Sequence, residues 1–319
     1  MYAQRAEPMR SARSPARLPW KKDIKRNGFL YLLYAPTLCY LVIFHYIPMF
    51  GVAIAFEDFN IRRGVFGSRW IGFDNFIDLF TGETFGLVMR NTVGMALLNL
   101  TIGFIAPILL ALVLCEVRNK RFKRITQTIT YMPFFVSTMV VCQLARFFLA
   151  REGGVTLLLS ALGLPKQNWL ANPNLPVFWL INCFTDIWQG TGYGSIVYVA
   201  AISAVNGDLH EAAAIDGAGR FRRIVSITIP SIKPMIIMML TLRVGTVFMS
   251  GFDKILLLYM PRTYDVADVI STYTYRMAFG SSINYGLSAA SGLFQSLVAT
   301  ALLLLSNAMN RRLTAYSLF

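Results

Sequence analysis

The strongest constraint on this chain is a series of long apolar runs that contain few charged residues. The runs cover residues 29–56, 88–115, 127–149, 175–204, 232–258 and 285–309. A helix of about 20 residues crosses the hydrocarbon layer of a bilayer, so each run is long enough to span a membrane. Only 14% of the 319 residues are charged and 55% are hydrophobic, which excludes a water-soluble globule. The sequence therefore predicts an all-α, polytopic membrane protein with six transmembrane helices.

Basic residues gather in alternate connections between these runs. They crowd the segment before the first run, the loops at 118–124 and 220–233, and the chain end at 311–312. Because Lys and Arg favour cytoplasmic loops, we expect both termini and these two loops to lie in the cytoplasm. Topology then accounts for the excess of 30 Lys and Arg over 16 Asp and Glu, and nucleic-acid binding is not indicated. We divide the chain into a basic cytoplasmic tail, residues 1–27, and a six-helix membrane domain, residues 28–319.

Two connections that this topology places outside the cell have the periodicity of short helices. Residues 71–80 carry aromatic and acidic groups at helical spacing, which is typical of an amphipathic helix at a membrane interface. Residues 155–162 form a second such segment. The outer connections are therefore predicted to be partly helical rather than irregular.

The cysteines do not indicate a disulfide framework or a metal site. Cys39, Cys115, Cys142 and Cys183 lie within or at the end of apolar runs, and no CxxC pair occurs. We expect them to be packing residues.

The cytoplasmic loop at 205–231 is the most informative segment. It contains the sequence DLHEAAAIDGAGRFRRI and continues to Pro230. Asp208 predicts a helix N-cap because Glu211 follows three residues later, and Gly217 predicts the end of that helix. We expect two short helices, after which Pro230 restarts the chain before the fifth span. Its alanines and glycines would let another protein approach closely, whereas the alternative is an ordinary interfacial loop.

Seven residues of this loop follow a fixed spacing. They are Glu211, Ala212, Ala213, Gly217, Ile227, Ile229 and Pro230. The spacing resembles the EAA signature of permease subunits in binding-protein-dependent ABC importers, although Ile229 replaces the more frequent leucine with little change of volume. Four further segments resemble the oligosaccharide and polysaccharide branch, which includes permeases for maltose, plant-polysaccharide fragments and alginate. They are residues 44–52, 55–60, 116–123 and 264–270.

The resemblance implies the type I permease fold of ABC importers, in the inner membrane of a bacterium and surrounded by membrane lipid. It also implies that the loop is a coupling helix which lies in a cleft of an ATPase subunit. The positions carried over to that contact are Glu211, Ala212, Ala213, Asp216 and Gly217. The implied partners are a second homologous permease, two ATP-binding subunits and an extracytoplasmic solute-binding protein. No cofactor is expected on this chain, and ATP with Mg²⁺ would lie on the ATPases, since no GxxxxGK[ST] segment occurs here.

Polar side chains within the apolar runs are few, and each is costly in hydrocarbon, so each is expected to face a cavity or a partner. The candidates for a substrate pathway are Asn182, Asp186, Trp188, Gln189, Tyr193, Arg243 and Asp253. Aromatic faces with amide and carboxylate groups suit a sugar, because its C–H faces stack on rings and its hydroxyls need donors and acceptors.

Structural interpretations of the same residues are equally open. Asp186 could pair with Arg243 as a bridge between spans, and the two aromatic residues could be interfacial anchors or core. Asp253 and Lys254 could be solvated at the outer boundary. Three alternating glycines, Gly190, Gly192 and Gly194, would let the fourth span either bend or pack closely against a neighbour.

The resemblance predicts a transport subunit that performs no covalent chemistry and moves an oligosaccharide or polysaccharide by alternating access. The class of saccharide is left open, although Arg146, Arg243 and Lys254 would suit an acidic one such as alginate. The alternative is an ATPase-independent secondary sugar transporter or channel, for which Asp186 is the only acid deep in a run. An intramembrane enzyme is disfavoured, because two histidines and no clustered acids within the runs leave no set of catalytic groups.

Overall fold

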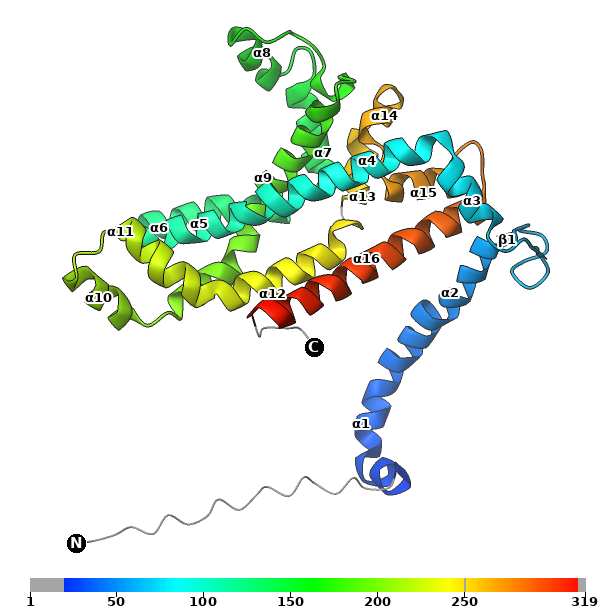
Figure 1. Cartoon of the computed structure of the whole chain (residues 1–319), viewed down its shortest axis with the longest axis horizontal. Coiled ribbons are helices and arrows are strands. Elements are labelled where there is room, and N and C mark those ends of the chain that lie inside the picture. Colours follow the sequence, from blue (N-terminus) through cyan, green and yellow to red (C-terminus); the bar gives the residue numbers. More distant parts are fainter. Residues whose placement is uncertain (1–19, 250, 315–319) are drawn as a thin grey trace. The chain divides into compact units, whose positions relative to one another are not determined.

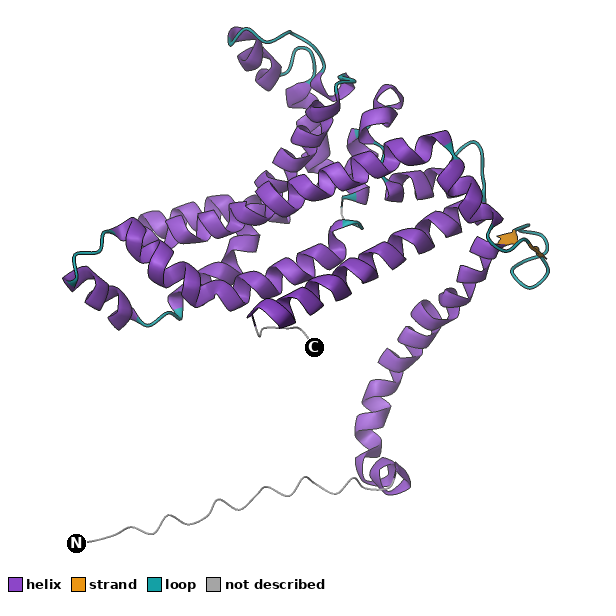
Figure 2. Cartoon of the chain, in the orientation of Figure 1, coloured by secondary structure: helices purple, strands orange, loops and turns teal. Residues whose placement is uncertain are grey.

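The computed structural model describes residues 20–249 and 251–314, and most of these are helical (Figure 1, Figure 2). Within the predicted basic tail, residues 1–19 lie outside the described residues, and residues 20–27 belong to the first helix. The chain divides into two compact units at Val52 and Ala53, and each is described by itself.

The first unit consists of one interrupted helix. Helix α1 (Trp20–Leu41) continues through the π-helical segment η1 (Val42–Tyr46) into α2 (Ile47–Met49), and the 3-10 segment η2 (Phe50–Phe56) follows. Large apolar side chains such as that of Phe29 are exposed along most of its surface. A helix that is apolar all round is stable in hydrocarbon rather than in water.

The second unit begins with a small antiparallel hairpin, in which β1 (Glu57–Asp58) pairs with β2 (Arg69–Trp70). The amphipathic helix α3 (Asp74–Thr81) follows, and α8 (Gly154–Ala161) lies further along the chain, so both predicted helices in the outer connections are confirmed. The other helices are α4 (Glu83–Leu98), α5 (Phe104–Glu116), α6 (Lys120–Tyr131), α7 (Thr138–Leu149), α9 (Leu175–Ser203), α10 (Gly207–Ile215), α11 (Arg220–Arg223), α12 (Ile229–Val247), α13 (Phe252–Leu258), α14 (Tyr264–Ala267), α15 (Ile270–Phe279) and α16 (Tyr285–Thr314). Short 3-10 turns are η4 (Met132–Phe135), η5 (Trp169–Ala171) and η7 (Pro261–Thr263).

Long helices of the second unit pack along one another. α5 lies against α9, while α16 packs on α12, α15 and α3. One buried cluster joins α4, α7, α9, α13 and α14 through residues that include Met95, Cys142, Phe178, Leu258 and Val266. A second cluster of Leu79, Val88, Ile270 and Tyr273 joins α3, α4 and α15. These clusters hold the short helices α13–α15 against the long ones.

Four helical stretches are long and apolar enough to cross a membrane: Lys22–Phe56, Glu83–Glu116, Arg220–Val247 and Tyr285–Arg312. A fifth candidate is the pair Lys120–Phe135 and Thr138–Ala161, which is bent by 99°. Helix α9 has 29 residues, but it carries several polar side chains and is not among them. The described residues thus supply four or five candidate spans, and six spans with both ends in the cytoplasm remain a prediction.

Two predicted spans are not continuous helices. In the run at 127–149, Pro133 lies in the turn η4, and the Ser137 hydroxyl accepts a hydrogen bond from a backbone N–H to start α7. The run at 232–258 breaks after α12, and Gly251, with φ 85°, precedes α13. The prediction of one uninterrupted helix is therefore wrong for both runs, because a proline and a left-handed glycine stop helix propagation without lowering the apolar content.

Each π-helical segment is followed closely by a proline. Segments η1, η3 (Asn99–Gly103) and η6 (Ile224–Thr228) precede Pro48, Pro107 and Pro230 respectively. The ring of a proline clashes with the carbonyl four residues earlier, and in all three cases that carbonyl belongs to the π segment. The wider turn lets the helix continue, so the predicted restart at Pro230 is wrong and Arg220–Val247 forms one helical stretch.

Close packing of α9 on α6 depends on one of the three alternating glycines. A Cβ atom added at Gly192 would lie 1.8 Å from the backbone oxygen of Thr130. At Gly194 the nearest atom is 3.4 Å away on Pro107, and at Gly190 nothing lies within 4 Å. Gly192 therefore serves close helix packing, which was one of the two predicted roles.

The first prediction tests this contact with the variant Gly192→Ala. Its methyl group forces α6 and α9 apart, and overpacking of this kind costs about 1–3 kcal/mol of unfolding free energy. The measurement is the thermal unfolding temperature of the purified protein in detergent. Gly190→Ala is the matched control on the same helix and should unfold close to wild type, so equal unfolding temperatures for the two variants would contradict the packing account.

Candidate functional site

A cavity of about 710 Å³ lies between α9 and the breaks that interrupt two predicted spans. The break between η4 and α7 contributes residues 134–138, and the break between α12 and α13 contributes Met249 and residues 251–254. The remaining lining residues are Gly103, Pro107, Asp186, Ile187, Gln189, Gly190, Thr191, Gly194 and Arg243. Broken helices expose backbone groups that need partners, and the Gln189 side chain donates to the Val136 carbonyl at 3.0 Å.

A chain of polar contacts crosses this cavity wall and links four elements of the fold. Lys254 of α13 forms an ion pair with Asp186 of α9. The Asn99 amide of η3 donates to the same carboxylate at 3.1 Å, and Arg243 of α12 donates to the Asn99 oxygen. A Cβ atom at Gly103 would lie 2.9 Å from that oxygen, so the glycine makes room for the contact.

The contacts correct two interpretations of the sequence. Asp186 pairs with Lys254 rather than with Arg243, and Asn99 stands between Asp186 and Arg243. The Lys254 side chain is only 7% exposed, so the alternative that it is solvated is wrong. Sequence reasoning missed Asn99, although it is an amide in an apolar run, the same signal that selected Asn182.

The charges on the cavity wall balance one another. Asp186 and Lys254 neutralise each other, while Arg243 and the exposed Asp253 provide one further charge of each sign. The Arg243 Nε atom is buried and has no hydrogen-bond partner. Arg243 is therefore the cationic group at this wall with an unused donor.

The other predicted pathway residues lie outside this cavity. Asn182 is buried in the core, where its amide contacts the Met95 sulfur at 3.9 Å. Trp188 lines an apolar groove with Phe148 and Phe184. Tyr193 stacks on the cavity residue Phe134, with ring centres 3.9 Å apart. The structure thus brings Asp186, Gln189, Arg243 and Asp253 together, and it leaves Asn182, Trp188 and Tyr193 behind or beside them.

The second prediction tests the ion pair with Lys254→Met, which leaves the Asp186 carboxylate without its cation. Breaking a buried pair costs about 3–5 kcal/mol, because one charge stays uncompensated. The double variant Lys254→Met/Asp186→Asn has no such charge and should recover most of the loss. Thermal unfolding of the three proteins in detergent measures this, and a double variant less stable than the single one would argue against a buried pair.

Helix α10 lies in the loop that the sequence predicts to be cytoplasmic and to contact a partner. Its N-cap is Asn206, whose side-chain oxygen accepts from the Asp208 N–H at 3.0 Å, so the prediction of Asp208 as the cap is wrong. Asn and Asp are equally good caps, and the earlier one sets the helix start. The predicted helix end is confirmed, since Gly217 has φ 77° and the Ala218 N–H donates to the Ala213 carbonyl at 2.9 Å.

Helix α10 and the turn after it project from one end of the long helices of the second unit (Figure 1). Glu211, Ala212, Asp216 and Gly217 are exposed, and Ala213 is half-buried. Two large apolar side chains are almost free of contacts, with Ile215 88% and Phe221 80% exposed.

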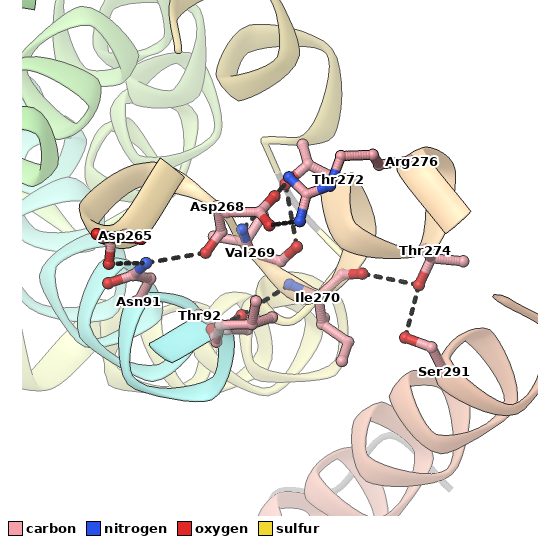
Figure 3. Close-up of polar contacts among 11 residues, drawn as sticks. Asn91, Thr92, Asp265, Asp268, Val269, Ile270, Thr272, Thr274, Arg276 and Ser291 are labelled. Carbon is pink, nitrogen blue, oxygen red and sulfur yellow. Dashed lines mark hydrogen bonds and ion pairs between the residues drawn. The ribbon is translucent and has the colours of Figure 1, made fainter. Parts of the chain in front are cut away.

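A second polar network anchors the segment from α14 to α16 (Figure 3). The buried Asn91 amide of α4 donates to the backbone oxygens of Asp265 and Asp268, at 3.1 and 3.0 Å. The Asp268 carboxylate accepts from Thr272 at 2.6 Å and from Arg276 at 2.5 Å. Burial raises the pKa of Asp268 above its usual range, although both of these partners act to lower it.

The same network reaches the last helix. The Ile270 N–H donates to the Thr92 hydroxyl at 3.0 Å, and the hydroxyls of Thr274 and Ser291 lie 2.8 Å apart (Figure 3). These contacts join α4, α15 and α16 into one body. Residues 264–270, which resemble a segment of the permease family, therefore form a well-anchored connection rather than a loose loop.

Comparison with protein families and curated proteins gives consistent matches. The model of the binding-protein-dependent transport system inner membrane component matches residues 103–315. Protein LplB of Bacillus subtilis (strain 168) is 39% identical over 303 residues, which is 95% of this chain and 94% of the relative. The polygalacturonan/rhamnogalacturonan transport system permease protein YteP of the same organism is 39% identical over 288 residues, covering 90% and 89%.

Solved structures give matches over nearly the whole chain. One is a chain from a bacterial ABC transporter involved in the import of the acidic polysaccharide alginate, with a TM-score of 0.85 and 41% identity. It covers 92% of this chain and 99% of that one. Another comes from the bacterial alginate ABC transporter in complex with an alginate pentasaccharide-bound periplasmic protein, with a TM-score of 0.85 and 40% identity. The residues that the family model matches include the lining of the cavity and α10.

Proposed function

Because this chain belongs to the family of binding-protein-dependent transport system inner membrane components, we propose that it is the permease of an ATP-driven importer of acidic oligosaccharides. The observation that carries the proposal is the structural similarity over 92% of the chain to part of a transporter of an acidic polysaccharide. The relatives are transport subunits, and this chain is likewise not an enzyme. An ATPase-independent transporter, the alternative from the sequence, is disfavoured by family membership.

We propose that α10 is the contact with an ATPase subunit. Support comes from its small exposed residues, since Ala212 and Ala213 allow close approach, and from the exposed Ile215 and Phe221. Glu211 would supply a charged contact, while Asp216 and Gly217 form the turn. ATP and Mg²⁺ would be held by that partner.

We call α10 and the turn after it, residues 207–219, the coupling segment. One helix connects this segment with the cavity. Arg220–Val247 runs from the turn after α10 to the cavity residue Arg243, a path of roughly 35 Å at 1.5 Å per residue. A push on α10 would therefore move Arg243 without the need for a flexible linker. This mechanical link supports alternating access driven from the ATPase side.

The assembly that we propose contains this chain, a second homologous permease, two ATPases and an extracytoplasmic solute-binding protein in a bacterial inner membrane. Support comes from the similar transporter crystallised with a saccharide-bound periplasmic protein. The saccharide would pass along Asp186, Gln189, Arg243 and Asp253. The Arg243 guanidinium suits a sugar carboxylate because its paired N–H groups match the two oxygens. Asn182, Trp188 and Tyr193 would support this wall from behind.

The third prediction tests coupling with Gly217→Val in the transporter reconstituted with its ATPases and binding protein. A side chain in the left-handed region costs roughly 1–2 kcal/mol per residue. The turn therefore shifts, and the orientation of α10 relative to the following helix changes. We expect stimulated ATP hydrolysis and uptake to fall about tenfold, which corresponds to 1.4 kcal/mol. Gly219→Val is the matched control, because Gly219 has φ −65° and open space around it.

An assembled Gly217→Val transporter that couples as well as the Gly219→Val control would count against a coupling role for α10. In the same vesicles, the wild-type chain without its partners should move no saccharide. Steady uptake by the chain alone would overturn the proposal of an ATP-driven permease.

The fourth prediction tests the substrate class with Arg243→Gln. Loss of the guanidinium should lower the uptake of an acidic oligosaccharide about tenfold, a 1.4 kcal/mol effect, and should leave uptake of a neutral one of equal length close to wild type. Lys233→Gln is the matched control, since Lys233 is an exposed cation on the same helix and does not line the cavity. An equal loss for both sugars would remove the acidic class and leave a general structural role.

A further inference from the structure

A separate cavity of about 340 Å³ lies beside α10, where the ends of several helices meet. Its polar lining residues come from the end of α5, the loop after it, α10, α11 and η6: Cys115, Glu116, Arg118, His210, Arg220, Arg223 and Thr228. The residues Leu112, Ile202 and Ile224 form an apolar wall on one side. We propose that this cavity, called here the arginine cavity, binds a phosphate group, as carried by the headgroup of an anionic phospholipid.

The charge of the arginine cavity favours an anion. Arg118, Arg220 and Arg223 face one carboxylate, that of Glu116. None of the three forms an ion pair within the described residues 20–249 and 251–314, where the ion pairs involve Lys166, Lys254 and Arg276. A guanidinium carries paired donors that match phosphate oxygens. The arginine cavity therefore holds net positive charge that the protein itself does not neutralise.

Arg223 has donors that the protein leaves unused. Its Nε atom is buried without a hydrogen-bond partner, and its Nη1 atom donates a long hydrogen bond of 3.4 Å to the His210 carbonyl. Unpaired buried donors are costly unless a ligand or water satisfies them. A phosphate in the cavity would supply the missing acceptors.

The position along the candidate spans favours a lipid as the source of the phosphate. The apolar stretch Glu83–Glu116 ends at this cavity, and the stretch Arg220–Val247 begins there. The ends of membrane-spanning helices lie at the level of the lipid headgroups. Basic pockets between spans on the cytoplasmic side attract anionic lipids, and the wall of Leu112, Ile202 and Ile224 suits the start of an acyl chain.

The bound phosphate would join the end of α5 to the segment that follows α10. It would contact Arg118 after α5, and Arg220 and Arg223 after α10. The lipid would thereby hold the coupling segment to the ends of α5 and α9. This inference goes beyond the transport function, and its binding test does not need transport.

The fifth prediction is a binding experiment on the purified full chain in phosphatidylcholine nanodiscs, with phosphatidylglycerol titrated in and retained lipid counted by native mass spectrometry. Arg223→Gln should weaken the retained phosphatidylglycerol about tenfold, or 1.4 kcal/mol. Glu116→Gln should strengthen it, because the one opposing carboxylate is gone. Arg124→Gln is the matched control, an exposed arginine on α6 outside the cavity, and should behave as wild type.

A second measurement uses wild-type arginines and so does not depend on variant folding. In a Cys39→Ser background, Cys115 is the accessible thiol, since Cys142 and Cys183 are buried. Phosphatidylglycerol should slow its reaction with a charged maleimide severalfold compared with phosphatidylcholine alone. Inorganic phosphate in phosphatidylcholine discs is the soluble arm, and protection by it at millimolar concentration would also support a phosphate site while identifying a soluble source.

The proposal is overturned if neither source protects Cys115. It is equally overturned if Arg223→Gln and Arg124→Gln lose phosphatidylglycerol to the same extent, because the attraction would then be a diffuse effect of surface charge.

Discussion

Charged and amide side chains inside apolar helices need ion-pair or hydrogen-bond partners, and this requirement determines how the second unit of the molecule packs. An unpaired charge near the middle of a bilayer costs about 2.5–3.5 kcal/mol on insertion scales. Asp186, Lys254, Asn99 and Arg243 avoid that cost by joining α9, α13, η3 and α12 in one chain of contacts. The two helix breaks beside this chain open the cavity, so the same polar groups that fix the packing also line the space between the helices.

The long helices and several local features were predictable from the sequence, whereas the tertiary pairs were not. Apolar runs indicate helices because their length matches the bilayer, and Gly217 indicates a helix end because it tolerates a left-handed backbone. A run of 20 residues averages out single residues, so the breaks at Pro133 and Gly251 left no signal in the apolar pattern. The choice between Lys254 and Arg243 as partner of Asp186 depends on the direction in which α13 leaves the break, which no local spacing encodes.

Proline and the π-helical segments explain how a chain with many helix-breaking residues keeps long continuous helices. In η3 the wide turn also presents Asn99 to Arg243, and in η6 it lets one helical stretch run from the coupling segment to the cavity. A local solution to a steric clash therefore also places a polar group and keeps the helix from Arg220 to Val247 continuous. The proposed phosphate site lies at the start of this stretch, at the end opposite to the cavity residue Arg243.

The contact at Gly192 limits which amino acids can replace this residue during evolution. Because the backbone of α6 occupies the volume of any side chain there, no other amino acid fits without separating α6 from α9, which lines the cavity. The neighbouring positions 190 and 194 have room to vary. A saturation library of α9 should therefore record one nearly invariant position flanked by tolerant ones, a pattern that reports the spacing of two helices without any structure determination.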